Sequence, residues 1–284
     1  MAEIVSVIAL AHAPGATGWL DKAPAHEQEA IKVGYGRMAG RLRAARPDVI
    51  VGIANDHMLN FSVENVPDWC VGIADRWHGP SEWFRDWINV PDYAVAGNRD
   101  LGRTIVRECA KRGINLAFSE KLEFDDNWSV PLNFLTPDHD VALVPIHMNC
   151  VLPPMPQPER CVAFGRALAE VIKAWPQELR VAVMATGGLS HDPGGQKYFD
   201  VDEKFDRWFL ELLGAGDEAR VLRELSIEKM LGAGDGGTVE LLAWLVAMGA
   251  AQTLAPGRGS ETMFYVPSVP LRCGMGGVEW AVCA

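Results

Sequence analysis

The sequence lacks several features that would place the protein outside the class of compact globular domains. No basic region precedes its apolar start, Met1–Ala11, which contains Glu3, so this segment predicts a buried strand rather than a signal peptide. The longest apolar run, Leu241–Ala251, is well short of the roughly 20 residues that span a bilayer. No CxxC pair occurs, and we expect reduced thiols at Cys70, Cys109, Cys150, Cys161, Cys273 and Cys283. These absences predict a cytoplasmic protein without a membrane partner.

Positive charge is also scarce. The chain has 26 Lys and Arg residues against 37 Asp and Glu residues, which gives a net charge of −11. An acidic chain lacks the electrostatic surface that binds a phosphate backbone, so nucleic acid is excluded as an expected partner. Hydrophobic residues make up 49% and charged residues 22% of the 284 residues, which is typical of a folded soluble chain of one or two domains.

Short apolar runs alternate with longer amphipathic segments, a pattern typical of an α/β domain. The expected strands are Ile4–Leu10, Val49–Ala54, Cys70–Ala74, Leu116–Ser119, Val141–Ile146, Val181–Thr186 and Met263–Val266. The expected helices are Glu27–Ala45, Asp100–Arg112, Arg160–Trp175, Asp202–Leu213, Asp217–Leu225 and Thr238–Ala251. Leu152–Pro158, Gly232–Gly237 and the Trp-rich Trp77–Trp87 are expected to be loops. We see no repeat, and we predict one domain over residues 1–284, with a mixed, partly parallel central sheet flanked by helices.

Three histidines share one context, because each follows an expected strand. His12 follows the first strand, His57 follows the second, and His191 follows a late strand through a Gly-Gly pair. The loops at the carboxyl ends of parallel strands form the ligand crevice of an α/β sheet. A lone histidine is more often a satisfied structural residue than a ligand. Three in this placement together indicate a site.

A metal site that admits both a substrate and a small gas needs two imidazoles and one carboxylate on one face of the ion. Glu240 is the best candidate for the carboxylate, because it lies at the start of the helix that follows the flexible GAGDGG loop. The alternative is structural, since a glutamate near a helix N-terminus is favourable through the helix dipole alone. Spacing does not decide between the two.

An ordered set of motifs runs nearly end to end through the chain. It comprises Ala11-His12-Ala13-Pro14, Asn55-Asp56-His57, Pro131-Leu132-Asn133-Phe134-Leu135, Val144-Pro145-Ile146, Gly187-Gly188-Leu189-Ser190-His191, and Thr238-Val239-Glu240 leading into Trp244. In this order and content the chain resembles the class III extradiol ring-cleaving dioxygenases.

The resemblance implies that His12, His57 and Glu240 hold one Fe(II) ion, while His191 serves as an acid–base group beside the substrate. The substrate would be a ring with a vicinal diol: catechol-like, protocatechuate- or gallate-like, or 3-hydroxy-4-pyridone-like. Both atoms of O₂ would enter the product. Histidine suits the proton-transfer role because its ordinary pKa lies near neutrality. We also expect a homo-oligomer, and the need for a small accessory subunit stays open.

The sequence departs from the family pattern at Asp125-Asp126-Asn127-Trp128, where several relatives carry Asp-His-Gly. Asp126 then stands where a second catalytic histidine would be. It is either an ordinary loop carboxylate or a substrate contact that accepts a ring N–H or O–H, which would suit a nitrogen-bearing substrate. Asp56 and Asp192 are either acceptors that orient the neighbouring histidines or solvated loop carboxylates.

Of the remaining histidines, His147 ends a strand near the crevice and is the one candidate for an additional pocket residue. Core or surface roles are nevertheless expected for all four, His26, His78, His139 and His147. Two other functions use the same residues. One is a non-enzymatic metal-binding or signalling protein on this fold, since one scaffold can host unrelated activities. The other is a zinc hydrolase, because two histidines and a carboxylate also suit zinc. Ring cleavage of any diol by the iron-loaded protein would separate the dioxygenase from both.

Overall fold

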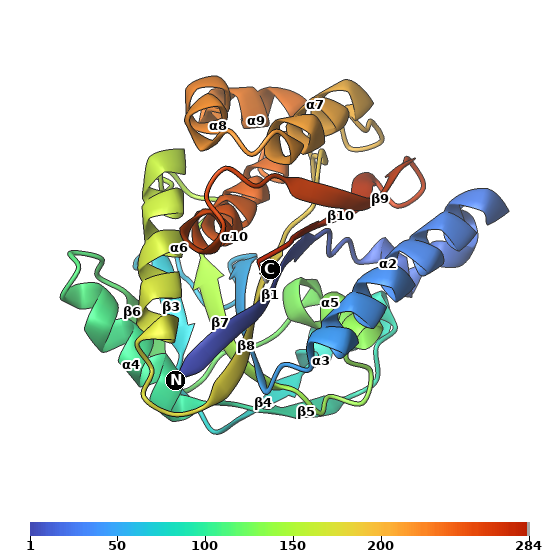
Figure 1. Ribbon diagram of the computed structural model, residues 1–284. Coiled ribbons are helices and arrows are strands. Elements are labelled where there is room, and N and C mark those ends of the chain that lie inside the picture. The colour runs from blue at the N-terminus through green and yellow to red at the C-terminus, as the bar shows by residue number, and fades with distance from the viewer. Residues whose placement is uncertain (283–284) are drawn as a thin grey trace.

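The computed structural model describes residues 1–282 and shows an α/β architecture around one eight-stranded sheet (Figure 1). The strand order is β6-β3-β7-β2-β8-β1-β10-β9. The strands of this sheet are β1 Ala2–Leu10, β2 Val49–Asn55, β3 Trp69–Gly72, β6 Ala117–Ser119, β7 Ala142–Met148, β8 Leu179–Thr186, β9 Ser260–Ser268 and β10 Cys273–Trp280. The central strands β7, β2, β8 and β1 are parallel, whereas β10 and β9 are antiparallel to their neighbours. The predicted mixed, partly parallel sheet is confirmed.

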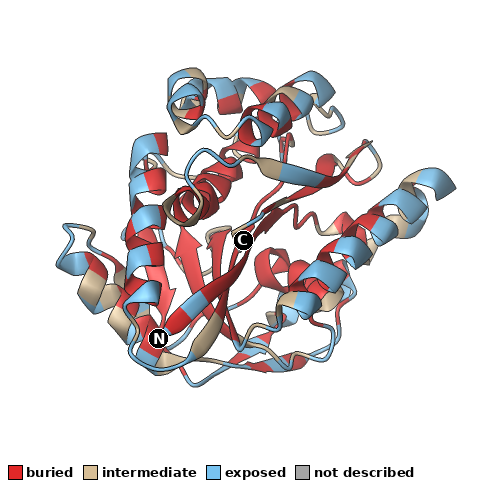
Figure 2. Ribbon diagram, in the orientation of Figure 1, coloured by how far each residue is buried: buried red, intermediate tan, exposed pale blue. Residues whose placement is uncertain are grey.

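Helices cover both faces of this sheet. The helical segments are α1 Gly15–Gly18, η1 Leu20–Lys22, α2 Ala25–Ala45, α3 Glu82–Ile88, α4 Arg99–Ala110, α5 Asp126–Leu135, α6 Pro158–Lys173, α7 Glu203–Gly214, α8 Glu218–Glu224, α9 Ile227–Ala233, η2 Thr238–Glu240 and α10 Leu241–Leu254. Helices α4, α6 and α10 pack on one face, and α2 and α5 pack on the other. The central strands are therefore buried on both sides, as Figure 2 shows, which explains why they are apolar runs without alternation.

The apolar helix α10 is buried along almost its whole length because it packs against both the sheet and the neighbouring helix α6. Glycine makes this close contact possible. A Cβ atom at Gly165 would lie 2.0 Å from the carbonyl oxygen of Val246, and one at Gly249 would lie 2.3 Å from that of Val162. Within residues 1–282, no helix has the length and apolar character needed to cross a membrane.

Parallel pairing brings three loops together at one edge of the sheet. Strand β8 lies between β2 and β1, and Leu10 at the end of β1 is in register with Thr186 at the end of β8. Strand β2 ends close by, at Asn55. The loops that follow these three ends carry His12, His191 and His57, as the sequence predicted.

The structure corrects the predicted loop Trp77–Trp87. This segment lies in β4 (Arg76–Gly79) and α3 (Glu82–Ile88), and β4 forms a small separate sheet with β5 (Tyr93–Ala96). Regular structure forms here because Trp77, Phe84 and Ile88 bury their side chains. The five cysteines other than Cys283 are free and buried, as expected, and Cys283 lies outside the described residues.

Candidate functional site

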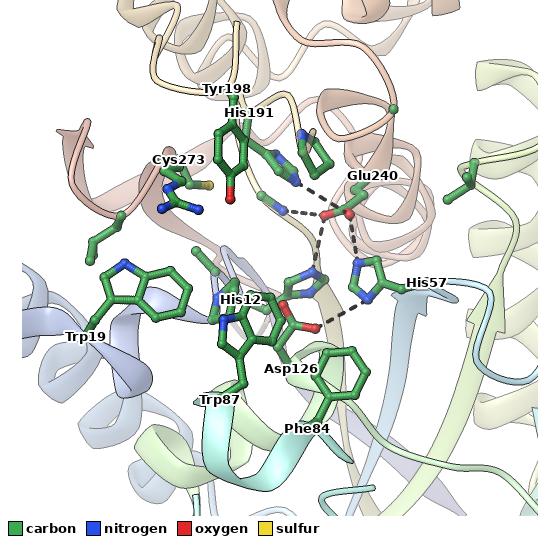
Figure 3. Close-up of a pocket in the computed structure, with 18 of the residues that line it drawn as sticks. His12, Trp19, His57, Phe84, Trp87, Asp126, His191, Tyr198, Glu240 and Cys273 are labelled. Atoms are coloured by element: carbon green, nitrogen blue, oxygen red, sulfur yellow. Dashed lines mark hydrogen bonds and ion pairs between the residues drawn. The ribbon is translucent and has the colours of Figure 1, made fainter. Parts of the chain in front are cut away.

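A pocket of about 390 Å³ opens at the carboxyl ends of β1, β2 and β8. All five residues singled out from the sequence line it: His12, His57, Asp126, His191 and Glu240 (Figure 3). The structure thus brings together side chains from separate parts of the chain. Most of the remaining wall is apolar or aromatic, including Trp19, Phe84, Trp87, Val151, Pro193 and Leu271.

The hydrogen bonds of His12 fix its tautomer. Its Nδ1 atom lies 3.1 Å from the hydroxyl oxygen of Thr186. That hydroxyl donates its proton to the carbonyl of Asn127 at 3.0 Å, so it accepts a hydrogen bond from Nδ1–H of His12. The lone pair of the neutral ring is therefore on Nε2, which lies 3.3 Å from the carboxylate of Glu240.

Asp125 orients His57 in the same way. The Nδ1 atom of His57 lies 3.0 Å from Asp125 and 3.4 Å from Asp126, while its Nε2 atom lies 3.0 Å from Glu240. Asp125 is fully buried, and its carboxylate also caps α5 by accepting from the backbone N–H of Asn127. Burial alone would raise the pKa of Asp125, but the charge and hydrogen bond of His57 lower it. The ionised Asp125 thus accepts from Nδ1–H and leaves Nε2 of His57 for another partner.

Glu240 can enter the site because two glycines stand opposite it. Gly187 has a φ of 150°, and a Cβ atom there would lie 2.9 Å from the Cβ of Glu240. The backbone N–H of Gly188 donates to the carboxylate at 2.8 Å, and the side-chain amide of Asn55 donates at 3.3 Å. Burial alone would raise the pKa of Glu240, but the charges of His12 and His191 hold it well below its usual value.

These contacts test whether the residues suit a metal ion. The Nε2 lone pairs of His12 and His57 and the carboxylate of Glu240 are all acceptors, yet they face one another at 3.3 and 3.0 Å. Such an arrangement needs positive charge, supplied either by a cation or by protons on the imidazoles. The pKa of His57 is raised well above its usual value because the charges of Asp125 and Asp126 outweigh the effect of burial. The donor set fits a divalent metal with nitrogen and oxygen ligands.

Asp126 is an alternative third ligand. His12, His57 and Asp126 each offer a ligand atom, and these three atoms lie within 4.8 Å of one another. Asp126 is the first residue of α5 rather than a loop residue, and its carboxyl group faces the pocket (Figure 3). Burial, aided by the charge of Asp125, raises its pKa to about 6.

His191 is held between two glycines. A Cβ atom at Gly188 or at Gly237 would lie 2.5 or 2.6 Å from its ring. The Nδ1 atom donates to the carbonyl of Leu189 at 2.9 Å, so the lone pair is on Nε2, which lies 3.7 Å from Glu240. Burial alone would lower the pKa of His191, but the charge of Glu240 raises it. The ring therefore presents a single titratable nitrogen to the pocket.

The expectations for two aspartates are wrong. Asp56 does not orient His57; it is buried and accepts hydrogen bonds from Asn60, Phe61 and His147. Asp192 is also buried, and its carboxylate accepts from the backbone of Lys197 rather than from His191. The core role expected for His147 is confirmed, because this residue is fully buried and does not line the pocket.

The contacts of His147 lie in the core. Its Nε2 accepts from Trp128 at 2.9 Å, and its Nδ1 lies 3.1 Å from Asp56. Sequence reasoning also missed Thr186 and Asp125, which fix the tautomers of His12 and His57. Only Asp125 had a signal, its place next to Asp126.

Similar proteins were found at low identity. A 2,3-dihydroxyphenylpropionate/2,3-dihydroxicinnamic acid 1,2-dioxygenase of Photorhabdus laumondii is 26% identical over 78% of this chain and 67% of its own length. Gallate dioxygenase of Pseudomonas putida is 28% identical over 62% of this chain, and the match spans about half (51%) of that relative. A dioxygenase of Cupriavidus necator, named like the first, is 24% identical over 88% of this chain and 90% of its own length.

A solved structure supports the fold. The crystal structure of an uncharacterized protein from Escherichia coli K12 matches with a TM-score of 0.54 and 15% identity, over 88% of this chain and 92% of the other. The family model described as the catalytic LigB subunit of aromatic ring-opening dioxygenase matches residues 6–268. Because this match covers most of the 284 residues, the chain belongs to the LigB family of aromatic ring-opening dioxygenase catalytic subunits, the class III extradiol enzymes.

Proposed function

We propose that the protein is an Fe(II)-dependent extradiol dioxygenase. It opens an aromatic or heteroaromatic ring at a carbon–carbon bond next to a vicinal diol and inserts both atoms of O₂ into the product. The observation that carries the proposal is the meeting of two Nε2 lone pairs with a buried carboxylate at one end of the pocket, with His191 alongside. Bound Fe(II) would supply open coordination positions for the two ring oxygens and for O₂.

His12, His57 and Glu240 are the proposed iron ligands. Thr186 and Asp125 hold the Nδ1 protons of the two histidines, so each ring offers Nε2 on the side where Glu240 lies. Asp126 instead contacts His57 on its Nδ1 side. An ion bound through Nε2 of His57 therefore meets Glu240 and leaves the bond to Asp125 intact, which favours Glu240 over Asp126 as the third ligand.

His191 is the proposed acid–base residue. Its Nδ1–H is occupied by the carbonyl of Leu189, so its Nε2 accepts a hydroxyl proton from the diol and later returns a proton to the opened ring. The flanking Gly188 and Gly237 hold the imidazole ring of His191 in position for both proton transfers. The aromatic walls of the pocket, including Phe84 and Trp87, would surround the substrate ring and limit the access of water to it.

Anaerobic loading with Fe(II) followed by oxygen uptake tests the proposal. The panel comprises catechol, 3,4-dihydroxybenzoate, gallate, 2-aminophenol and 3-hydroxy-4-pyridone, and we expect at least one of them to consume one O₂ per ring opened. The zinc-loaded protein is the matched control and should consume none. If no diol supports uptake, or if the zinc form acts as a hydrolase, the proposed reaction is wrong.

Iron content of purified variants tests the assigned roles. We expect His12→Ala, His57→Ala and Glu240→Ala to lose iron. His191→Ala should keep iron and lose about 10²- to 10⁴-fold in rate, the usual contribution of an acid–base group. Asp126→Asn should also keep iron. An iron-free Asp126→Asn together with an iron-replete Glu240→Ala would reverse the choice of third ligand.

A further inference from the structure

We propose that Arg272 forms an anion subsite that binds a carboxylate carried by the substrate ring and so sets the orientation of the ring. This inference rests on the proposed function, because it names a substrate class for the same pocket. Among the described residues that line the pocket, Arg272 is the one arginine or lysine. It stands out in a chain whose net charge is −11.

The guanidinium of Arg272 is stacked by aromatic rings. It lies 4.2 Å from the centroid of Tyr198, 5.2 Å from that of Phe199 and 5.8 Å from that of Trp19. Stacking uses the face of the planar group, whereas its N–H donors point outward from the edge. Within residues 1–282, no carboxylate or carbonyl accepts from this side chain. The edge is therefore free to bind an anion.

The turn that carries Arg272 has a defined conformation. Arg272 has a φ of 61°, in the left-handed region that favours glycine or asparagine, within the turn that joins β9 to β10. The turn is also fixed, because Trp19 donates to the carbonyl of Pro270 at 3.1 Å.

The charges of the pocket favour one orientation of the substrate ring. Trp19 and Tyr198, which stack on Arg272, lie on the opposite side of the pocket from His57 (Figure 3). Two carboxyl groups, of Asp126 and Glu240, lie at the histidine end. A ring bound in the reverse sense would place its carboxylate beside these groups and away from Arg272. Attraction at one end and repulsion at the other therefore direct the diol toward His12 and His57.

A carboxylate suits this subsite because a guanidinium edge can bind its two oxygens with parallel hydrogen bonds. The matched ligands are 3,4-dihydroxybenzoate and the uncharged 3,4-dihydroxybenzamide, which differ only in the charged group. Arg272→Asn removes the guanidinium while suiting the left-handed backbone, so this variant should fold. Arg272→Lys keeps the charge without the planar edge. Arg46→Asn is the matched control, because Arg46 is an exposed arginine with a φ of 47° that does not line the pocket.

Calorimetric titration of the metal-free protein measures the subsite without turnover. We expect wild type and Arg46→Asn to bind the benzoate at least 10-fold more tightly than the amide. Arg272→Asn should bind the benzoate about 10- to 100-fold more weakly and the amide within 2-fold of wild type, the usual effect of charge-assisted hydrogen bonds. Arg272→Lys should bind the benzoate with an affinity between those of wild type and Arg272→Asn. Equal losses for both ligands, or no preference in wild type, would overturn the inference.

Oxygen uptake by the iron-loaded proteins tests the proposed reaction separately from the proposed subsite. If Arg272→Asn loses kcat/KM for the benzoate but keeps turnover of the amide, both the reaction and the subsite are supported. If wild type binds the benzoate through Arg272 but consumes no O₂ with any diol, the proposed function fails and the subsite stands. If diols are cleaved without any effect of Arg272, the subsite fails alone.

Discussion

Replacement of Asp56 by asparagine should destabilise the fold and loosen the turn that carries His57. One carboxylate oxygen accepts from the side chain of Asn60 at 2.7 Å and lies 3.1 Å from Nδ1 of His147; the other accepts from the backbone N–H of Phe61 at 3.0 Å. The backbone N–H of Asn60 lies 3.2 Å from both oxygens. In Asp56→Asn, one of these oxygens becomes an NH₂ group that faces N–H donors in either orientation of the amide.

The expected loss follows from the number of hydrogen bonds removed. At least one hydrogen bond to a charged acceptor is lost and a second is weakened, each worth about 1.5 to 3 kcal/mol, so we expect about 3 kcal/mol. A loss of this size leaves a domain with the usual stability of about 5 to 15 kcal/mol folded. Urea unfolding followed by tryptophan fluorescence and circular dichroism measures it. Iron retention should fall as well, because the turn holds His57.

Asp75→Asn is the matched control for this prediction. Asp75 pairs with Arg99 at 2.9 Å, but its side chain is 75% exposed, so the same substitution should change the free energy of unfolding by less than about 1 kcal/mol. If Asp56→Asn and Asp75→Asn unfolded at the same urea concentration, the hydrogen-bond network around Asp56 would not support the turn as we argue.

Three further predictions concern other parts of the molecule. Burial raises the pKa of Asp206 to about 6 from an ordinary value near 4, so its contribution to stability should be full below about pH 4 and disappear as the pH rises through 6. The urea midpoint should show this trend, and Asp206→Asn should flatten it. Gly165→Ala should cost at least about 2 kcal/mol, because the new Cβ would lie 2.0 Å from the carbonyl oxygen of Val246; Gly36→Ala, with open space around it, should stabilise α2 by about 0.5 to 1 kcal/mol. If Asp126 accepts a ring N–H, Asp126→Asn and Asp126→His should lower kcat/KM for 3-hydroxy-4-pyridone more than for 3,4-dihydroxybenzoate, and equal losses on both would exclude that role.

The sequence predicted the strands that are buried along nearly their whole length. Strands β1, β2 and β8 are apolar runs, and their order along the chain was enough to place the histidines that follow them at one edge of the sheet. Strand β10 was missed because it has glycine at positions 274, 276 and 277, and glycine has a low propensity for strands. Close packing requires glycine at such positions, since a Cβ atom at Gly277 would lie 2.3 Å from the sulfur of Met38.

Side-chain partners at the site could not be read from neighbouring positions in the sequence. Asp56 is adjacent to His57, yet the partner of that histidine is Asp125, which the fold brings from the start of α5. Consecutive residues at the end of a strand point in different directions, so adjacency says little about contact. The same holds for Asp192 beside His191, whose ring is bonded to a backbone carbonyl instead.

In the proposed site, the start of α5 separates the residue that orients a metal ligand from the residue that can contact the substrate. Asp125, the capping residue, turns its carboxylate back onto the helix and onto Nδ1 of His57, where any change would disturb the proposed iron ligand. Asp126, one residue later, is the first helical residue and faces the pocket. Substitution at position 126 can therefore change what the pocket recognises while Asp125 continues to hold His57. In the proposed site, a change at position 126 would therefore leave the proposed ligands His12, His57 and Glu240 in place and act on a side chain that faces the substrate.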